Sequence, residues 1–109
     1  MSKESYSVRC IFRWSKPRNP KKKYTYEERI TLWRAKGFKK AIAKAEKEAK
    51  KYAKSLNYTY LKCAQAYKMF DVSKSDGIEV FSLLRDSNRK PQKYIDHFFD
   101  TGNERQHDF

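Results

Sequence analysis

The chain has 109 residues, a length that fits a single domain with one modest core. Lys and Arg number 26 against 13 Asp and Glu, which gives a formal net charge of +13, and aromatic residues make up 16% of the chain, too many for a disordered tail. No apolar run approaches the length of a transmembrane helix, and the polar first residues do not resemble a signal peptide. We therefore expect a cytoplasmic protein without a membrane partner.

The positive charge is concentrated in the first half of the chain. Residues 1–56 contain 18 basic and 5 acidic side chains, whereas residues 57–109 contain 8 of each. Such an asymmetry indicates a cationic footprint on one face, which would attract an acidic macromolecule. The alternative is a lysine-rich surface that is merely solvated.

A β-hairpin is predicted at the start of the chain. Apolar and polar side chains alternate over residues 5–14, which predicts a half-buried strand. Residues 15–23 hold two prolines and five basic residues and predict a loop. Residues 24–35 are rich in β-branched and aromatic side chains and predict a second strand. Since Trp33 falls on the face opposite Ile30, this strand is either covered on both sides or bulged.

Gly37 separates the hairpin from a long amphipathic helix. Apolar residues recur there at spacings of four and three over about five turns, while lysines occupy the opposite face. Asn57 is a plausible C-terminal stop. The apolar stripe consists of Phe38, Ile42, Ala45, Ala49, Tyr52 and Leu56.

A second hairpin and a short helix are predicted in the remainder. Residues 58–70 alternate again, residues 71–77 form a turn cluster, and residues 78–84 predict a fourth strand. Pro91 suits the first turn of a helix that ends at Gly102. The apolar face of the third strand comprises Leu61, Cys63, Tyr67 and Met69, and that of the short helix comprises Tyr94, Ile95, Phe98 and Phe99.

The predicted order of elements is β-β-α-β-β-α. We expect one α+β domain over residues 1–109, with its core in residues 5–102 and a frayed tail at 103–109. A four-stranded, mainly antiparallel sheet would carry the long amphipathic helix on one face. The short C-terminal helix would cover an edge or the remaining face, and the order of the strands stays open.

Catalytic chemistry has little support in the sequence. His97 and His107 have no evident partner for acid–base work, and Glu27 and Glu28 are strand neighbours that face opposite sides. The wide separation of Cys10 and Cys63 fits no zinc pattern, and phosphate-binding glycine loops are missing. We therefore expect a protein that is not an enzyme, with no cofactor, no metal and no small-molecule substrate.

Basic residues of the loop and the helix, with two neighbours on the second strand, are the predicted contacts to a partner. Arginine and aromatic side chains are included because they dominate interface hot spots. The candidates are Arg18, Lys21, Lys22, Lys23, Trp33, Arg34, Lys40, Lys47 and Lys51.

Three stretches of the chain resemble a known family. They are YTYEERITLWRA (24–35) with the Ala/Lys/Glu-rich helix after it (41–53), GIEVFSLLRDS (77–87) and YIDHFFDTGNERQ (94–106). Together they resemble small bacterial domains catalogued as a domain of unknown function, over residues 5–106. The resemblance implies a link to immunity proteins, which neutralise secreted antibacterial toxins, and it carries no catalytic residues. The basic insert at 16–23 and the net charge depart from the family pattern.

Two functions follow as hypotheses. The first is an immunity protein that binds a cognate toxin by protein–protein contact. Its difficulty is that nuclease toxins are usually basic, so a cationic inhibitor requires an acidic face on its toxin. The second is a non-sequence-specific nucleic-acid-binding domain that uses the basic loop and helix, with steep salt dependence.

Overall fold

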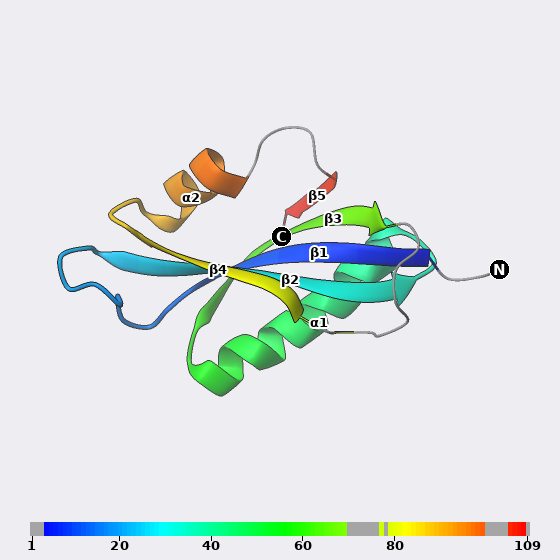
Figure 1. Cartoon of the computed structure of the whole chain (residues 1–109), viewed down its shortest axis with the longest axis horizontal. Coiled ribbons are helices and arrows are strands. Elements are labelled where there is room, and N and C mark those ends of the chain that lie inside the picture. Colours follow the sequence, from blue (N-terminus) through cyan, green and yellow to red (C-terminus); the bar gives the residue numbers. More distant parts are fainter. Residues whose placement is uncertain (1–3, 70–76, 78, 100–104, 109) are drawn as a thin grey trace.

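The computed structural model describes residues 4–69, 77, 79–99 and 105–108. The elements follow the predicted order up to the short helix, and a fifth strand comes after it (Figure 1). Their bounds are β1 Glu4–Arg13, β2 Tyr24–Ala35, α1 Phe38–Leu56, β3 Thr59–Met69, β4 Glu79–Ser87, α2 Pro91–Tyr94, the π-helical turn η1 Ile95–Phe99, and β5 Arg105–Asp108.

The sheet is antiparallel, with the strand order β4-β2-β1-β3-β5. The α+β class, the β1–β2 hairpin and the bounds of α1 are confirmed. Asn57 adopts the left-handed conformation (φ 57°) and ends α1, as predicted. The basic loop at residues 15–23 connects β1 to β2 at one end of the molecule (Figure 1).

The predicted hairpin of β3 and β4 is wrong. These strands lie on opposite sides of the β1–β2 hairpin, β3 beside β1 and β4 beside β2. Two open edges were available, and short sequence spacing does not decide which edge a strand takes. The Gly77 amide already donates to the Leu32 carbonyl (2.7 Å), so the chain follows β2 before β4 begins. The predicted turn at 71–77, apart from Gly77, and Gly102 lie outside the described residues.

The prediction of a frayed tail is also wrong for Arg105–Asp108. These residues form β5 and pair with β3 between Cys63 and Ala66. The sheet therefore has five strands rather than four. An open strand edge offers unpaired backbone donors and acceptors to any nearby extended segment, whatever the polarity of its side chains.

Helix α1 covers one face of the sheet and encloses the larger core. Its small alanines allow a close approach to β1 and β3. Phe12 packs edge-on to Tyr52, with ring centroids 5.1 Å apart. The buried members of this core are Tyr6, Val8, Cys10, Phe12, Ala35, Ala41, Ile42, Ala45, Ala49, Ala53, Tyr60, Ala64 and Ala66.

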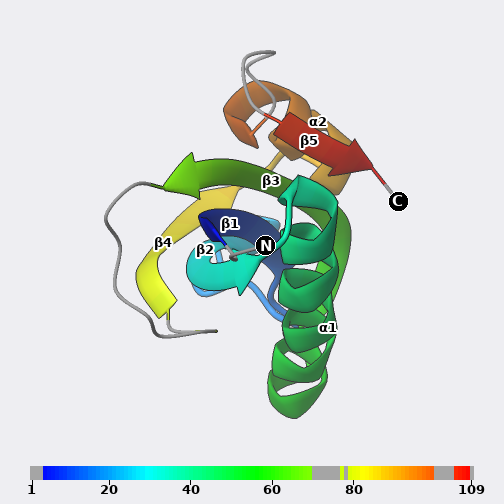
Figure 2. The same ribbon diagram turned by 90° about the vertical axis from the view of Figure 1, so that its right-hand side faces the viewer.

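The short helix covers part of the other face (Figure 2). Pro91 occupies the first turn of α2, as predicted, and Tyr94 stacks on Tyr26 with ring centroids 4.0 Å apart. The second core consists of Ile11, Tyr26, Cys63, Tyr94 and Ile95. The side chains of Phe98 and Phe99 lie outside the described ones.

Strand β3 does not use its predicted apolar face against α1. Tyr60, Ala64 and Ala66 face α1, whereas Leu61 and Cys63 belong to the second core. The pairing of β3 with β1 changes register between Tyr60 and Ala64. Lys62 lies in this interval, and its φ of 57° marks a β-bulge. Tyr67 and Met69 stay exposed. Cys10 and Cys63 are free thiols in different cores, on opposite faces of the sheet.

Among the described residues, none of the helices has both the length and the apolar character that crossing a membrane requires.

Candidate functional site

The acidic residues of the basic half are held by internal partners. Glu28 is 3% exposed and accepts from Arg9, Arg85 and the Tyr94 hydroxyl, the last at 2.8 Å. Arg9 also donates to the Gln65 amide oxygen at 3.0 Å. The cluster joins β1, β2, β3, β4 and α2. One buried carboxylate therefore ties the short helix to the sheet.

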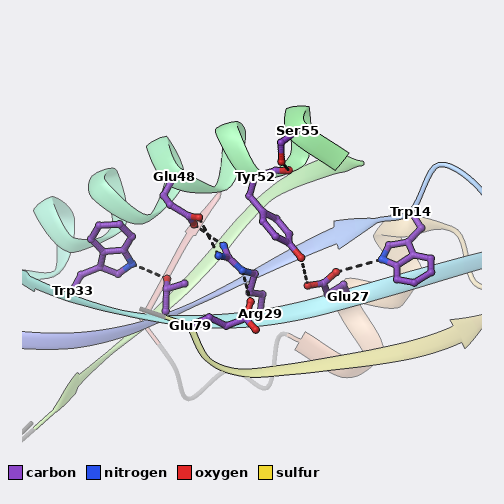
Figure 3. A network of polar contacts seen from close by, with 9 residues as sticks. Trp14, Glu27, Arg29, Trp33, Glu48, Tyr52, Ser55 and Glu79 are labelled. Atoms are coloured by element: carbon purple, nitrogen blue, oxygen red, sulfur yellow. Dashed lines mark hydrogen bonds and ion pairs between the residues drawn. The ribbon is translucent and has the colours of Figure 1, made fainter. Parts of the chain in front are cut away.

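Two further buried glutamates pair with aromatic side chains. Glu27 accepts from the Tyr52 hydroxyl (2.6 Å) and the Trp14 indole (3.3 Å), as Figure 3 shows. Glu46, on α1, accepts a short hydrogen bond from the Tyr60 hydroxyl. Burial raises the pKa of Tyr60, so this hydroxyl stays protonated and remains a donor.

Arg29 links β2 to α1 and β4. Its guanidinium donates to both oxygens of Glu48 (2.6 and 3.0 Å) and to Glu79 (2.5 Å), and it lies 3.9 Å from the centre of the Tyr52 ring (Figure 3). This arrangement satisfies the carboxylate of Glu48, which would otherwise face the lysines of α1.

The lysines of α1 form an unbalanced cationic surface. Of the seven lysines on the helix, six are exposed and Lys44 is half-buried. Lys44 donates to the Arg34 carbonyl at 2.6 Å. Within the described part of the chain, none of the seven forms an ion pair. On α1, Glu46 is buried and Glu48 is paired with Arg29 while six lysines are exposed, so the surplus charge predicted from the sequence reaches the solvent on this helix.

The charges in the first turn of α1 have the sign that destabilises the N-terminus of a helix. Its first turn contains no acidic residue, and Lys39 and Lys40 are exposed there. A helix N-terminus carries a partial positive charge that acidic side chains stabilise and lysines do not. Stability therefore does not account for the sign of this surface.

A groove lies between Trp33 of β2 and the cationic side of α1. It has a volume of about 390 Å³ and is lined by Trp33, Lys44, Lys47, Glu48 and Lys51. The Trp33 indole donates to the Thr31 hydroxyl at 2.6 Å. Gly77 lies against the ring, and a β-carbon there would come 3.2 Å from the indole. The Trp33 ring is thus fixed from two sides.

The structure brings only some of the predicted contact residues together. One groove is lined by Trp33 of β2 and by Lys47 and Lys51 of α1. Lys40 lies on the same helix as these two lysines. Arg34 is the strand neighbour of Trp33 and therefore points to the opposite face of the sheet.

The loop residues form a second cationic area. Lys21, Lys22 and Lys23 are exposed at the hairpin tip. Arg18 pairs with Asp86 (2.9 Å) and has a structural role beside its charge. The hydrogen bond from Arg18 holds the pKa of the Asp86 carboxyl below its usual value. The tip of the β1–β2 hairpin and the C-terminal end of α1 lie toward the same end of the molecule (Figure 1). Trp14 stacks there on Tyr58, with ring centroids 5.4 Å apart.

Sequence reasoning missed the groove as a unit. Lys44 and Glu48 also line the groove but were not among the predicted contact residues. Their helical spacing to Lys47 and Lys51 places them on the same side of α1 and could have identified them. The placement of Trp33 beside them had no sequence signal, because it depends on how α1 crosses β2. The internal partners of Glu27 and Glu28 were missed for the same reason.

His97 and Cys10 lie in different parts of the fold. His97 is exposed on η1, and the buried thiol of Cys10 has its pKa raised to about 12 by burial. Within residues 4–69, 77, 79–99 and 105–108, no group of three or more His, Cys, Asp or Glu side chains is placed so that it could bind a metal ion.

No family model, curated protein or solved structure gives a significant match to this chain.

Proposed function

We propose that this protein binds an acidic surface of a partner protein through the cationic side of α1, without catalysis. In its most concrete form, it is an immunity protein that neutralises a cognate secreted antibacterial toxin. The family resemblance of the sequence suggests the toxin, and the charge distribution suggests the binding surface.

The contrast between paired acidic residues and lysines without acidic partners carries the proposal. All five acidic residues of the basic half have partners within the fold, whereas the lysines of α1 have no carboxylate partners among the described residues. Self-repulsion of these lysines disfavours the compact state. A partner with complementary charge removes that cost and accelerates association.

The size of the helix fits this use. Its 19 residues span about 28 Å, a length suited to an interface that buries about 800 Å² on each partner. The proposal predicts an acidic face on the toxin, which can be checked from the toxin's own sequence or structure.

The test is complex formation with the toxin domain encoded beside this gene. The two purified proteins should elute together in size-exclusion chromatography at about 0.1 M salt, and dissociation should accelerate as the ionic strength rises. Co-expression should protect cells from the toxin. Separate elution of the two proteins, or a locus without a toxin gene, would overturn the proposal.

Nucleic acid is a second candidate partner, because the hairpin tip presents exposed lysines. Lys21, Lys22 and Lys23 lie side by side there. The amide of Lys23 is held by Asn88 (2.9 Å), and that of Lys21 by Asn19 (2.9 Å). Changing the three lysines to Glu should abolish retardation of RNA or DNA at low salt. If the wild-type protein causes no retardation at about 50 mM salt, this second candidate fails.

A further inference from the structure

The groove beside Trp33 has a lining that is mostly apolar although it includes charged residues. An indole and the aliphatic stems of lysines supply apolar surface, and the same lysines bring positive charge. Its volume of about 390 Å³ is at the small end of ligand sites. The groove therefore has room for one large side chain.

Trp33 and Lys44 are held in place before any partner binds. Trp33 is fixed by Thr31 and Gly77, and Lys44 by the Arg34 carbonyl. A rigid aromatic ring loses little conformational entropy on binding, which is why tryptophan is common in interface hot spots.

The charge of the lining defines the occupant. Among the described residues, three lysines line the groove, and the carboxylate of Glu48 is engaged by Arg29. Lys47 and Lys51 are exposed and lie one helical turn apart, so they can meet two carboxylates of one segment.

We infer that this groove receives an aromatic side chain from an acidic segment of the partner protein, whose flanking carboxylates pair with Lys47 and Lys51. The inference rests on the proposed function and places its contact at a defined point on α1. A single-stranded nucleic acid fits less well, because stacking along a strand uses successive aromatic rings and, among the described residues, Trp33 alone lines this groove with an aromatic ring.

A model peptide tests the groove independently of the toxin. The probe is a fluorescein-labelled 13-residue peptide with a central Phe, two acidic residues on each side and a Gly/Ser remainder. Its affinity is measured by fluorescence anisotropy at about 50 mM salt. The variant Lys47→Glu/Lys51→Glu is compared with Lys50→Glu/Lys54→Glu, which makes the same charge change on α1 outside the groove. Circular dichroism verifies that both variants fold.

The groove variant should weaken binding about tenfold, and the control variant less than threefold. Replacing the central Phe of the peptide by Ala should weaken binding about fivefold. Equal losses in both variants, an Ala peptide that binds as well as the Phe peptide, or no binding at 1 mM peptide would overturn the inference. So would a labelled dT12 strand that binds more tightly than the peptide and loses affinity only in the groove variant.

The toxin complex separates this inference from the proposed function. If both variants bind the toxin equally well, the proposed function stands and the groove is not the contact. If the toxin does not bind at all but the peptide binds with the expected selectivity, the groove inference stands and the immunity function fails.

Discussion

Glu28 shows how a charged residue is accommodated in the interior of this sheet. The carboxylate receives donors from Arg9, Arg85 and Tyr94, so its loss of hydration is offset by charge-assisted hydrogen bonds. Each partner comes from a different element. A change at this residue should therefore affect the whole fold rather than one strand.

Glu28→Gln should lower the free energy of unfolding by about 3 kcal/mol. The amide is nearly isosteric but removes the charge that two arginines share, and both arginines are only partly exposed. Urea denaturation measures the loss. Tyr94→Phe is the matched control and should cost about 1 kcal/mol, since it removes a hydroxyl that donates to Glu28 and accepts from Arg85 but leaves these two charges paired with each other. If Glu28→Gln lowers the free energy of unfolding by less than Tyr94→Phe does, the charge of Glu28 does not stabilise the fold.

Cys10 makes the fold sensitive to alkali. Burial raises the pKa of its thiol from 9.0 to about 12, so the folded state holds a proton that the unfolded state releases above pH 9. The contribution of Cys10 to stability is complete below pH 9 and is lost as the pH rises toward 12. The free energy of unfolding should fall between pH 9 and 11, and less steeply in Cys10→Ala. Identical slopes in both proteins would refute the assignment.

At the scale of elements, α1 combines a core face and a lysine-rich exposed face. Its alanine stripe allows close packing on β1 and β3, and Asn57 ends it. Its first turn is cationic, against the preference of a helix N-terminus. The helix therefore buries its alanines in the core and leaves six lysines at the surface.

Reversing the charge of the first turn should make the protein more stable. Lys39→Glu/Lys40→Glu should raise the free energy of unfolding by about 1 kcal/mol at low salt, because acidic groups complement the helix N-terminus. Lys50→Glu/Lys54→Glu lowers the net charge equally but lies toward the C-terminal end. If the control is stabilised as much, net charge rather than position explains the gain.

At the scale of the whole molecule, the β1–β2 hairpin carries β4 on one edge and β3 on the other. The two helices cover different faces, and two separate cores result. Close ion pairs occur inside this framework, while the surplus of positive charge lies on α1 and at the hairpin tip. Long-range repulsion between exposed lysines thus opposes folding.

Salt should therefore stabilise the protein. Raising NaCl from about 20 to 300 mM should increase the melting temperature by about 5 °C, because exposed like charges are screened more than buried pairs. Lys39→Glu/Lys40→Glu lowers the net charge from +13 to +9 and should show a smaller increase. A melting temperature that falls with salt would mean that surface ion pairs outweigh the repulsion.

The sequence by itself determined the local elements. Alternation specified β1, the β-branched and aromatic composition of residues 24–35 specified β2, the spacing of Phe38 to Leu56 specified α1, and Pro91 marked the start of α2. Such signals act over a few residues. It also located the charge surplus, which is a matter of counting.

Only the tertiary structure decided which distant residues meet. The β3–β4 hairpin was wrong because an open strand edge is chosen by packing, and the proximity of residues 69 and 79 along the chain does not enter that choice. The burial of Glu28 among two arginines and the meeting of Trp33 with Lys47 likewise depend on how separate elements cross. Such contacts leave no periodic trace in one sequence, because each partner satisfies only its own local pattern.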